Sequence, residues 1–283
     1  MDTRIQKNNQ RILNLLSEYL NNYETSITTN QINKLTKLGV SETQAFSLLL
    51  QNYLEIEDQD FINEYFPLMI NNLDEIVYRD NPYYQNIHFK NKKINNWNLS
   101  MTSYQAYEAF VCNDFCYLED ERVIPQIGFF NKPFSYPAVY ENNRLWMSIT
   151  PNEIETMKLP IAEAYGKVVT IGLGLGYYAY MVSLKEEVNE IIIVEQSKDV
   201  IKLFESEILP QFSHPEKIRI INKEAFVFLN DYHNLENVNY MFIDIWHDVS
   251  DGKMLYLKFK KYESQYPKIS FRYWIEKTIK YYL

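Results

Sequence analysis

The stretch from Val168 to Gln196, VVTIGLGLGYYAYMVSLKEEVNEIIIVEQ, constrains the fold of this chain more than any other. Three of the chain's seven glycines follow its first apolar run, and a second apolar run ends at Glu195. An apolar run, a glycine turn and a helix are typical of the opening of a βαβ unit. The stretch therefore predicts a parallel sheet whose first loop lets a ligand approach the backbone closely.

The residues after Lys167 alternate between short apolar runs and helical patterns. We predict strands at 168–171, 190–194, 217–222, 238–245 and 268–274, with helices at 177–185, 198–209, 225–232, 252–265 and the end of the chain. Strands that alternate with helices indicate a parallel sheet with helices on both faces. The predicted fold class is α/β, with a doubly wound, mostly parallel sheet of about five strands.

The residues before this sheet form two further predicted regions. A helical N-terminal region covers 1–78, with one helix over 42–54 that starts at a Ser41–Gln44 capping box and another over 59–73 that Pro67 kinks or shortens. A small β-rich region with a linking helix covers 79–160. It contains two or three short strands and a hairpin turn at Asn142–Asn143. The linking helix begins at Pro151, after a Thr150–Glu153 capping box, and the sheet domain covers 161–283.

Composition excludes several classes of protein. A formal net charge of −9 disfavours sequence-independent nucleic-acid binding, so no nucleic-acid partner is expected. Cys112 and Cys116 are the only cysteines and imply no disulfide framework, which fits a reducing compartment. No apolar stretch approaches the length of a membrane helix, so no membrane partner is expected either. These features together predict a cytoplasmic location.

The register of the glycines distinguishes two kinds of ligand. The dinucleotide fingerprint Gly-x-Gly-x-x-Gly/Ala fails from Gly172, because its third position falls on Tyr177; from Gly174 it fits, but Gly172 then lies in the strand. The simpler register is Gly172-x-Gly174-x-Gly176, directly after the strand. An acid at Glu195 accepts both hydroxyls of a ribose and repels a 2′-phosphate. The pattern therefore favours a nucleoside ligand over NADP.

These stretches resemble the class I S-adenosylmethionine-dependent methyltransferase family. The matching segments are VVTIGLGLGYYA, IIIVEQS, IINKEAFVFL and VNYMFIDIWHD, within residues 165–275. The resemblance implies a Rossmann-like fold and S-adenosylmethionine as cofactor. The implied cofactor-binding residues are Gly172, Gly174, Gly176, Glu195, Gln196, Glu224 and Ala225.

Two departures from the family bear on the substrate side. Thr170 stands where the family often has an acid. The family's sixth and seventh strands, which form a hairpin, have no counterpart after the fifth predicted strand. Part of the substrate wall is therefore expected from the N-terminal region or from another subunit, which keeps a homodimer open.

The segment FIDIWHD carries the predicted catalytic residues Asp244, His247 and Asp248. It resembles the Asp-x-Trp-x-Asp segment of metal-dependent catechol O-methyltransferases, in which the first Asp binds a metal and a Lys at the position of His247 is the base. Those enzymes also need an Asp-Asn pair that KISFRYWIEK does not offer, so no metal is assigned. His247 or Asp244 is the expected base. A structural pairing of His247 with Asp248 is the alternative.

A second resemblance is to spermidine synthases and related aminopropyltransferases. Residues 144–176 follow the hairpin, helix and glycine-loop layout of those enzymes. Their glycine loop usually contains an Asp where this chain has Leu175, and Asp244-x-x-x-Asp248 does not match their Asp-x-x-Asp segment. The predicted function is a methyltransferase acting on a small-molecule acceptor. An aminopropyltransferase and a non-catalytic nucleoside-binding module are the alternatives.

Overall fold

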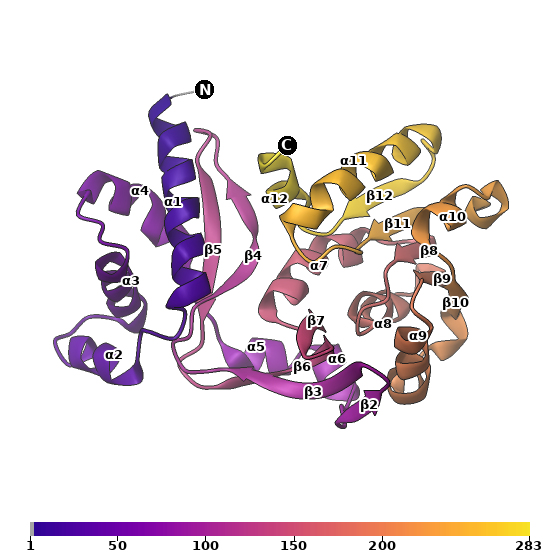
Figure 1. Cartoon of the computed structure of the whole chain (residues 1–283), viewed down its shortest axis with the longest axis horizontal. Helices are drawn as coiled ribbons and strands as arrows, with labels where there is room; N and C mark the ends of the chain where they lie inside the picture. The colour runs from indigo at the N-terminus through magenta and orange to yellow at the C-terminus, as the bar shows by residue number, and fades with distance from the viewer. Residues whose placement is uncertain (1–2) are drawn as a thin grey trace. The chain divides into compact units, whose positions relative to one another are not determined.

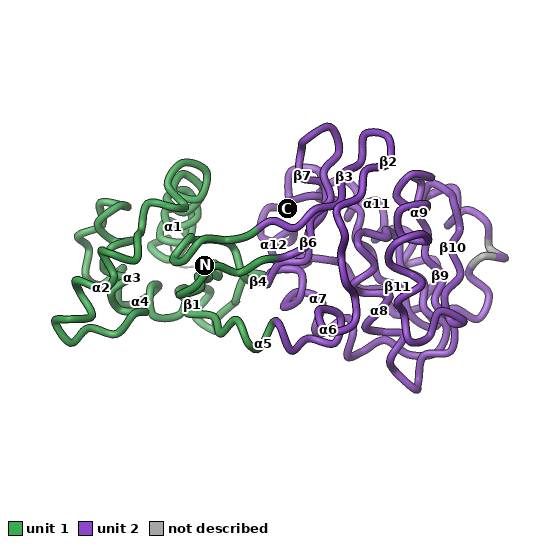
Figure 2. Tube along the Cα trace, turned by 90° about the horizontal axis from the view of Figure 1, so that it is seen from below, with its two compact units in different colours: residues 1–78, 103–135 green, residues 79–102, 136–283 purple. Residues whose placement is uncertain are grey.

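The structure of this chain is a computed structural model that describes residues 3–283, so Met1 and Asp2, which open the predicted region 1–78, lie outside it. The chain forms two compact units (Figure 2). The first consists of residues 1–78 and 103–135, and the second of residues 79–102 and 136–283. The chain therefore leaves the first unit, returns to it and leaves it again.

The first unit combines helices with a three-stranded sheet. Its helices are α1 (Thr3–Asn22), α2 (Thr29–Thr36), α3 (Glu42–Tyr53), α4 (Gln59–Met69) and most of α5 (Glu75–Arg79), and its strands β1 (Ile70–Asn72), β4 (Phe110–Tyr117) and β5 (Val123–Phe129) lie in the order β1-β5-β4. The predicted Ser41–Gln44 capping box is present at the start of α3. The predicted helix over 59–73 is too long at its end, because α4 ends at Met69, two residues after Pro67, and β1 begins at Ile70.

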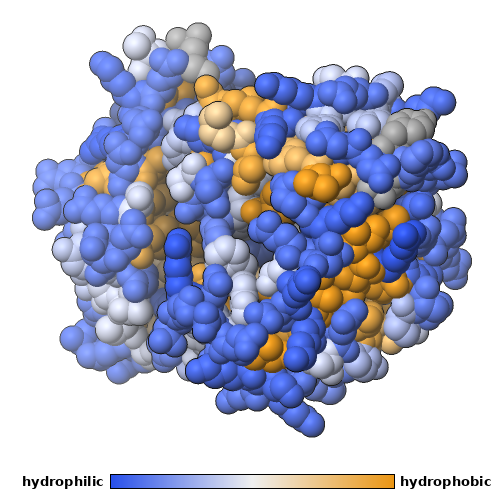
Figure 3. Space-filling view, turned by 45° about the vertical axis from the view of Figure 1, so that its right-hand side comes forward, coloured by the Kyte–Doolittle hydropathy of each residue, from blue (hydrophilic) through white to orange (hydrophobic). Residues whose placement is uncertain are grey.

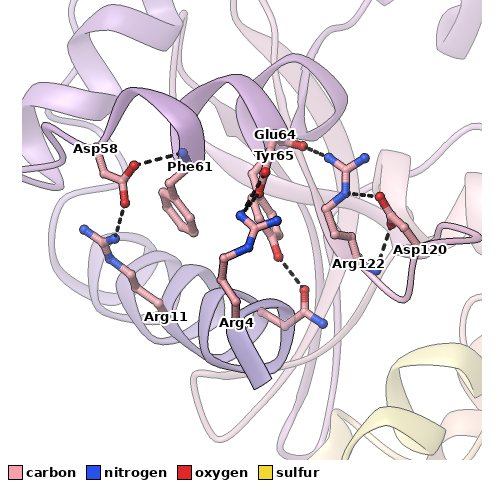
Figure 4. A network of polar contacts seen from close by, with 9 residues as sticks. Arg4, Arg11, Asp58, Phe61, Glu64, Tyr65, Asp120 and Arg122 are labelled. Carbon is pink, nitrogen blue, oxygen red and sulfur yellow. Dashed lines mark hydrogen bonds and ion pairs between the residues drawn. The ribbon is translucent and has the colours of Figure 1, made fainter. Parts of the chain in front are cut away.

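A buried asparagine joins α1 to the rest of the first unit. The side chain of Asn9 accepts hydrogen bonds from the Tyr65 hydroxyl at 2.7 Å and from the Val123 N–H at 3.0 Å. Its amide donates to the carbonyl of Glu121 at 3.1 Å. Ion pairs at the surface add smaller contributions to the same packing; Figure 4 shows Arg4 with Glu64, Arg11 with Asp58, and Arg122 with Asp120.

A second sheet has four strands, two before β4 in the chain and two after β5. Its strands β2 (Lys92–Ile94), β3 (Trp97–Tyr104), β6 (Phe134–Glu141) and β7 (Arg144–Ser148) lie in the order β2-β3-β6-β7. The predicted hairpin turn is confirmed: Asn142 and Asn143 have φ of 50° and 66°, as a tight β-turn requires. Two or three strands were too few, since β2 to β7 all fall within 79–150. Pro125 and Pro137 lie inside two of these strands, which makes the strands hard to identify from the sequence.

The predicted parallel sheet is confirmed as a five-stranded, all-parallel sheet in a mixed α/β protein. Its strands β8 (Gly166–Ile171), β9 (Val188–Glu195), β10 (Ile218–Asn222), β11 (Tyr240–Ile243) and β12 (Ser270–Tyr273) lie in the order β10-β9-β8-β11-β12. The order runs outward in both directions from the neighbours β8 and β11. In open parallel sheets the ligand crevice lies at such a point, beyond the carboxyl ends of the strands.

Helices cover both faces of this sheet. Figure 1 draws α8 (Tyr177–Ser183) and α9 (Lys198–Leu203) on one side, with α10 (Ala225–Leu229) and α11 (Val249–Gln265) on the other. The remaining helices of this unit are α6 (Pro82–Asn86), α7 (Pro151–Glu163) and α12 (Glu276–Tyr281). The predicted helix over 198–209 is α9 followed by a π-helical turn at Phe204–Ile208.

The surface drawn in Figure 3 is mostly hydrophilic, with apolar patches between the polar side chains. None of the helices described here combines the length and the apolar character that crossing a membrane requires.

We predict that Asn9→Ala lowers the free energy of unfolding by about 2–4 kcal/mol, because it removes a partner of the buried Tyr65 hydroxyl, the buried Val123 N–H and the part-buried Glu121 carbonyl. Urea denaturation followed by circular dichroism measures this loss. Asn14→Ala is the matched control, since Asn14 lies on the same helix but is exposed. A loss no larger than that of the control would contradict a stabilising role for the Asn9 contacts.

Candidate functional site

A cavity of about 540 Å³ lies within the second unit, at the carboxyl ends of β8, β9 and β11. Residues 172–175, β7, the start of α7 and the segment after β11 contribute to its wall. Eight of the ten residues predicted for the site line it: Gly172, Gly174, Glu195, Gln196, Glu224, Ala225, Asp244 and His247. Gly176 and Asp248 do not. The cavity therefore brings most of the predicted site residues together at the switch point of the sheet.

The glycines after β8 have different physical roles. A Cβ on Gly172 would lie 1.9 Å from the backbone oxygen of Asp244, so only glycine allows β8 and β11 to end this close together. Gly174 has φ of 55°, and a Cβ there would meet no atom within 4 Å, because its backbone faces open space. Gly176 is the N-cap of α8. Gly174 is thus the position at which a ligand can approach the backbone.

The loop is held from α6, a short helix outside the predicted cofactor domain. The Tyr83 hydroxyl donates to the carbonyl of Leu175, and the Asn81 amide donates to the Tyr177 hydroxyl at 3.0 Å. The neighbouring Tyr84 donates to the carbonyl of Ile149. These residues were missed from the sequence. The cap-and-proline pair at Asn81–Pro82 signals the helix, but not that its tyrosines reach the glycine loop.

Glu195 at the end of β9 faces the loop. One carboxylate oxygen accepts the N–H of Ser197 at 2.7 Å, and the other accepts the N–H of Leu173 at 3.3 Å. Burial raises the pKa of Glu195, and these hydrogen bonds offset part of the rise. A carboxylate has about four acceptor positions, so these backbone contacts leave capacity for a ligand hydroxyl. Next to it, Gln196 is exposed and its carbonyl accepts from Asn222 at 2.9 Å.

Glu224 has a structural role that the sequence did not suggest. It is the N-cap of α10, and its carboxylate accepts the N–H of Val227 at 2.9 Å. Ala225 follows it and is buried beside the cavity. Glu224 lines the cavity while one of its oxygens holds the helix, so the other oxygen is the one left for a ligand.

Two carboxyl groups lie in the wall next to the loop. Burial raises the pKa of Asp244 to about 7. Burial, and then the charge of Asp244, raise the pKa of Glu153 well above its usual range. Two carboxyl groups with raised pKa values are partly protonated at neutral pH, so the pair carries less than two full charges.

Glu153 was predicted for a different role, and that prediction is wrong. Thr150 is the N-cap of α7, but its side chain makes no capping hydrogen bond, so the Thr150–Glu153 box is absent. Pro151 at the start of the helix has no N–H to be capped. Glu153 lines the cavity instead.

The histidine of FIDIWHD pairs with a different acid from the one predicted. Nδ1 of His247 lies 3.2 Å from Oδ2 of Asp251, which lies in the first turn of α11. Asp248 is the N-cap of that helix and accepts the N–H of Ser250 at 2.6 Å. The predicted pairing of His247 with Asp248 is therefore replaced by a pairing with Asp251. The ring of Trp146 on β7 stands at 84° to the imidazole, with the ring centres 4.2 Å apart.

The cavity wall combines hydrogen-bond acceptors at Glu195 and an open backbone at Gly174 with the titratable side chains of Glu153, Asp244 and His247. Among residues 3–283, no group of three or more His, Cys, Asp or Glu side chains has the arrangement of a metal site. Protein-family models and curated proteins were both compared with this chain, and none matches it.

We predict that Asp244→Asn stabilises the protein at pH 8 by on the order of 2 kcal/mol. The folded protein binds the Asp244 proton more tightly than the unfolded chain does. Stability is therefore lost as the pH rises from the ordinary value of 3.8 towards about 7, and the loss is complete above that. The amide removes this charge penalty.

Urea unfolding at pH 5 and pH 8 measures the effect, which should be larger at pH 8. Asp80→Asn removes one negative charge from an exposed position and is the matched control. An equal effect of both variants at the two pH values would contradict the buried charge at Asp244.

Proposed function

We propose that this chain is a class I S-adenosylmethionine-dependent methyltransferase with a Rossmann-like cofactor domain and a small-molecule acceptor. The observation that carries the proposal is the open backbone at Gly174 beside Glu195, at the switch point of a parallel sheet. A net charge of −9 supports a small acceptor rather than a nucleic acid.

The residues present fit a nucleoside cofactor of this kind. Gly174 leaves free the space that any side chain would fill, and Glu195 keeps acceptor positions for ribose hydroxyls. Gln196, Glu224 and Ala225 line the same cavity. When bound, S-adenosylmethionine supplies a methyl group made electrophilic by its sulfonium.

The chain's own residues then position the acceptor and accept its proton. Glu153 and Asp244 lie next to the glycine loop, where they orient an acceptor by hydrogen bonding. His247 lines the cavity and has an imidazole suited to accept a proton near neutral pH. Alignment of the two reactants supplies a large part of the rate in such a transfer.

We predict that Gly174→Ala weakens S-adenosylmethionine binding at least about tenfold, because its Cβ occupies the space left for the ligand. Isothermal titration calorimetry measures the affinity. Gly39→Ala is the matched control: Gly39 also has positive φ and open space around it, but it lies in the first unit. Both variants place an alanine at positive φ, 55° at Gly174 and 88° at Gly39, and thermal melting of each variant separates backbone strain from a steric effect on the ligand.

The same titration with S-adenosylhomocysteine and NAD tests the cofactor. Binding of NAD alone would overturn the proposal. Failure to bind any of the three ligands would also overturn the proposal and would favour a structural module.

An aminopropyltransferase is the second candidate, and the Glu153–Asp244 pair is the observation that favours it. Ionisation of either carboxyl group places negative charge in the cavity, which attracts a protonated amine. The diamine acceptors of aminopropyltransferases are cations, whereas the hydroxyl acceptors of many methyltransferases are neutral.

For this candidate we predict that 1,4-diaminobutane binds and that Glu153→Gln weakens its binding about tenfold, because the charge-assisted contact is lost. Calorimetry measures the affinity, with Glu155→Gln as the control on the same helix, outside the cavity. Tighter binding of decarboxylated S-adenosylmethionine than of the intact cofactor supports this candidate. Absence of diamine binding would contradict it.

A further inference from the structure

The Asp251 carboxylate holds both the backbone and the imidazole of the catalytic segment. Its Oδ1 accepts the N–H of Asp248 at 3.1 Å, and the N–H of His247 lies 3.2 Å from both Oδ1 and Oδ2. Its Oδ2 lies 3.2 Å from Nδ1 of the His247 ring. One side chain therefore fixes the start of α11 and the orientation of the histidine together.

This double contact follows from the spacing at the helix start. Asp248 is the N-cap of α11, and Asp251 is the third residue of the helix, so the two form a capping box. The box holds the Asp251 carboxylate against the backbone of residues 247 and 248. His247 immediately precedes the N-cap, which brings its Nδ1 within reach of the remaining carboxylate oxygen.

The chemistry of a carboxylate determines the tautomer of His247. Asp251 is the acceptor in this contact, and the surrounding N–H groups and the imidazole outweigh the effect of burial and lower its pKa. An ionised carboxylate only accepts hydrogen bonds, so Nδ1 must carry the proton. Nε2 of the neutral ring then holds a lone pair.

The other ring nitrogen is free of protein partners. Nε2 of His247 is buried and has no hydrogen-bond partner among the described residues. His247 lines the cavity, and Trp146 stands against its ring. A buried acceptor without a partner is costly, and such a group is the one expected to meet a proton donor on a ligand.

We propose that Asp251 is a positioning residue: it holds His247 in the Nδ1–H tautomer so that Nε2 accepts the proton of the methyl acceptor. The catalytic part rests on the proposed function. The acceptor's O–H, N–H or S–H proton moves to Nε2. The electron pair left on the acceptor forms the bond to the methyl group, and the pair of the broken carbon–sulfur bond stays on sulfur. The resulting imidazolium is stabilised by the Asp251 carboxylate.

The Asp251→Asn variant reverses the tautomer, because the capping box fixes which way the amide points. The Asp248 N–H faces the Oδ1 position alone, and the His247 N–H lies between the two oxygens, so the amide oxygen stays at Oδ1 and the amide nitrogen takes the place of Oδ2. That nitrogen donates to Nδ1, so the ring proton moves to Nε2. When the neutral ring carries its proton on Nε2, this nitrogen has no lone pair left to accept the proton of the methyl acceptor.

Nitrogen-15 NMR of the full chain, with labelled histidine, reads the tautomer directly above neutral pH. His247→Gln assigns the signal among the four histidines. We expect Nδ1–H in the wild type and Nε2–H in Asp251→Asn. Asp248→Asn changes the neighbouring cap without touching the ring and should leave the His247 tautomer unchanged. Glu216→Gln alters the exposed His214–Glu216 pair and controls for loss of one charge.

Turnover tests the catalytic part. The substrates are S-adenosylmethionine and a panel of phenols, thiols and amines as methyl acceptors, and the assay measures the S-adenosylhomocysteine formed. Asp251→Asn should lower kcat about 100-fold or more with little change in KM for the cofactor, and Asp251→Glu should restore part of it. Thermal melting checks that the variants fold, and Asp251→Ala gives a second loss of the contact.

Three results would overturn the positioning role. They are a wild-type Nε2–H tautomer, a tautomer that Asp251→Asn and Asp251→Ala both leave unchanged, and a reversed tautomer with unchanged kcat. A wild-type chain that binds no S-adenosylmethionine overturns the proposed function and the catalytic part together. The NMR result then still decides whether Asp251 fixes the ring.

Discussion

The close approach of two strand ends, at Gly172 and Asp244, is the constraint on which the site depends. The N–H of Asp244 donates to the carbonyl of Ile171 at 2.9 Å, and a Cβ on Gly172 would overlap the Asp244 oxygen. This is where the strand order turns outward, so the crevice opens directly above the contact. The contact therefore places the glycine loop and the Asp244 carboxyl in one cavity.

The cavity contains groups that act against the stability of the folded protein. Burial raises the pKa of Asp244, Glu153 and Glu195, so each pays a desolvation penalty when charged. A core built for stability alone would have apolar residues at these positions. Carboxyl groups with raised pKa values in a cavity are typical of sites that bind or transform ligands. The tyrosines of α6 and the capping box of α11 hold the loop and the acid segment in place around this unfavourable charge.

The sequence predicted the parallel sheet because periodicity and glycine placement are local signals. The runs around Val168 and Ile192 and the glycine turn between them need no knowledge of distant contacts. The small β-rich segment was less predictable, since prolines interrupt its strands and its order β2-β3-β6-β7 depends on long-range pairing. Glu153 illustrates the same limit within the site. Its spacing from Thr150 matched a capping box, but α7 packs so that Glu153 lines the cavity.

His247 pairs with Asp251 and not with the predicted Asp248, because the start of a helix decides which acid can reach the histidine. Both acids follow His247 within four residues, and the sequence alone favours the nearer one. An N-cap side chain, however, accepts hydrogen bonds from the N–H groups of its own helix, so the Asp248 carboxylate accepts the N–H of Ser250. The third residue of the helix is the one whose side chain returns towards the residues before the cap. In this chain the histidine immediately before the acidic capping box is therefore placed to pair with the second acid, and its Nε2 has no hydrogen-bond partner among the described residues.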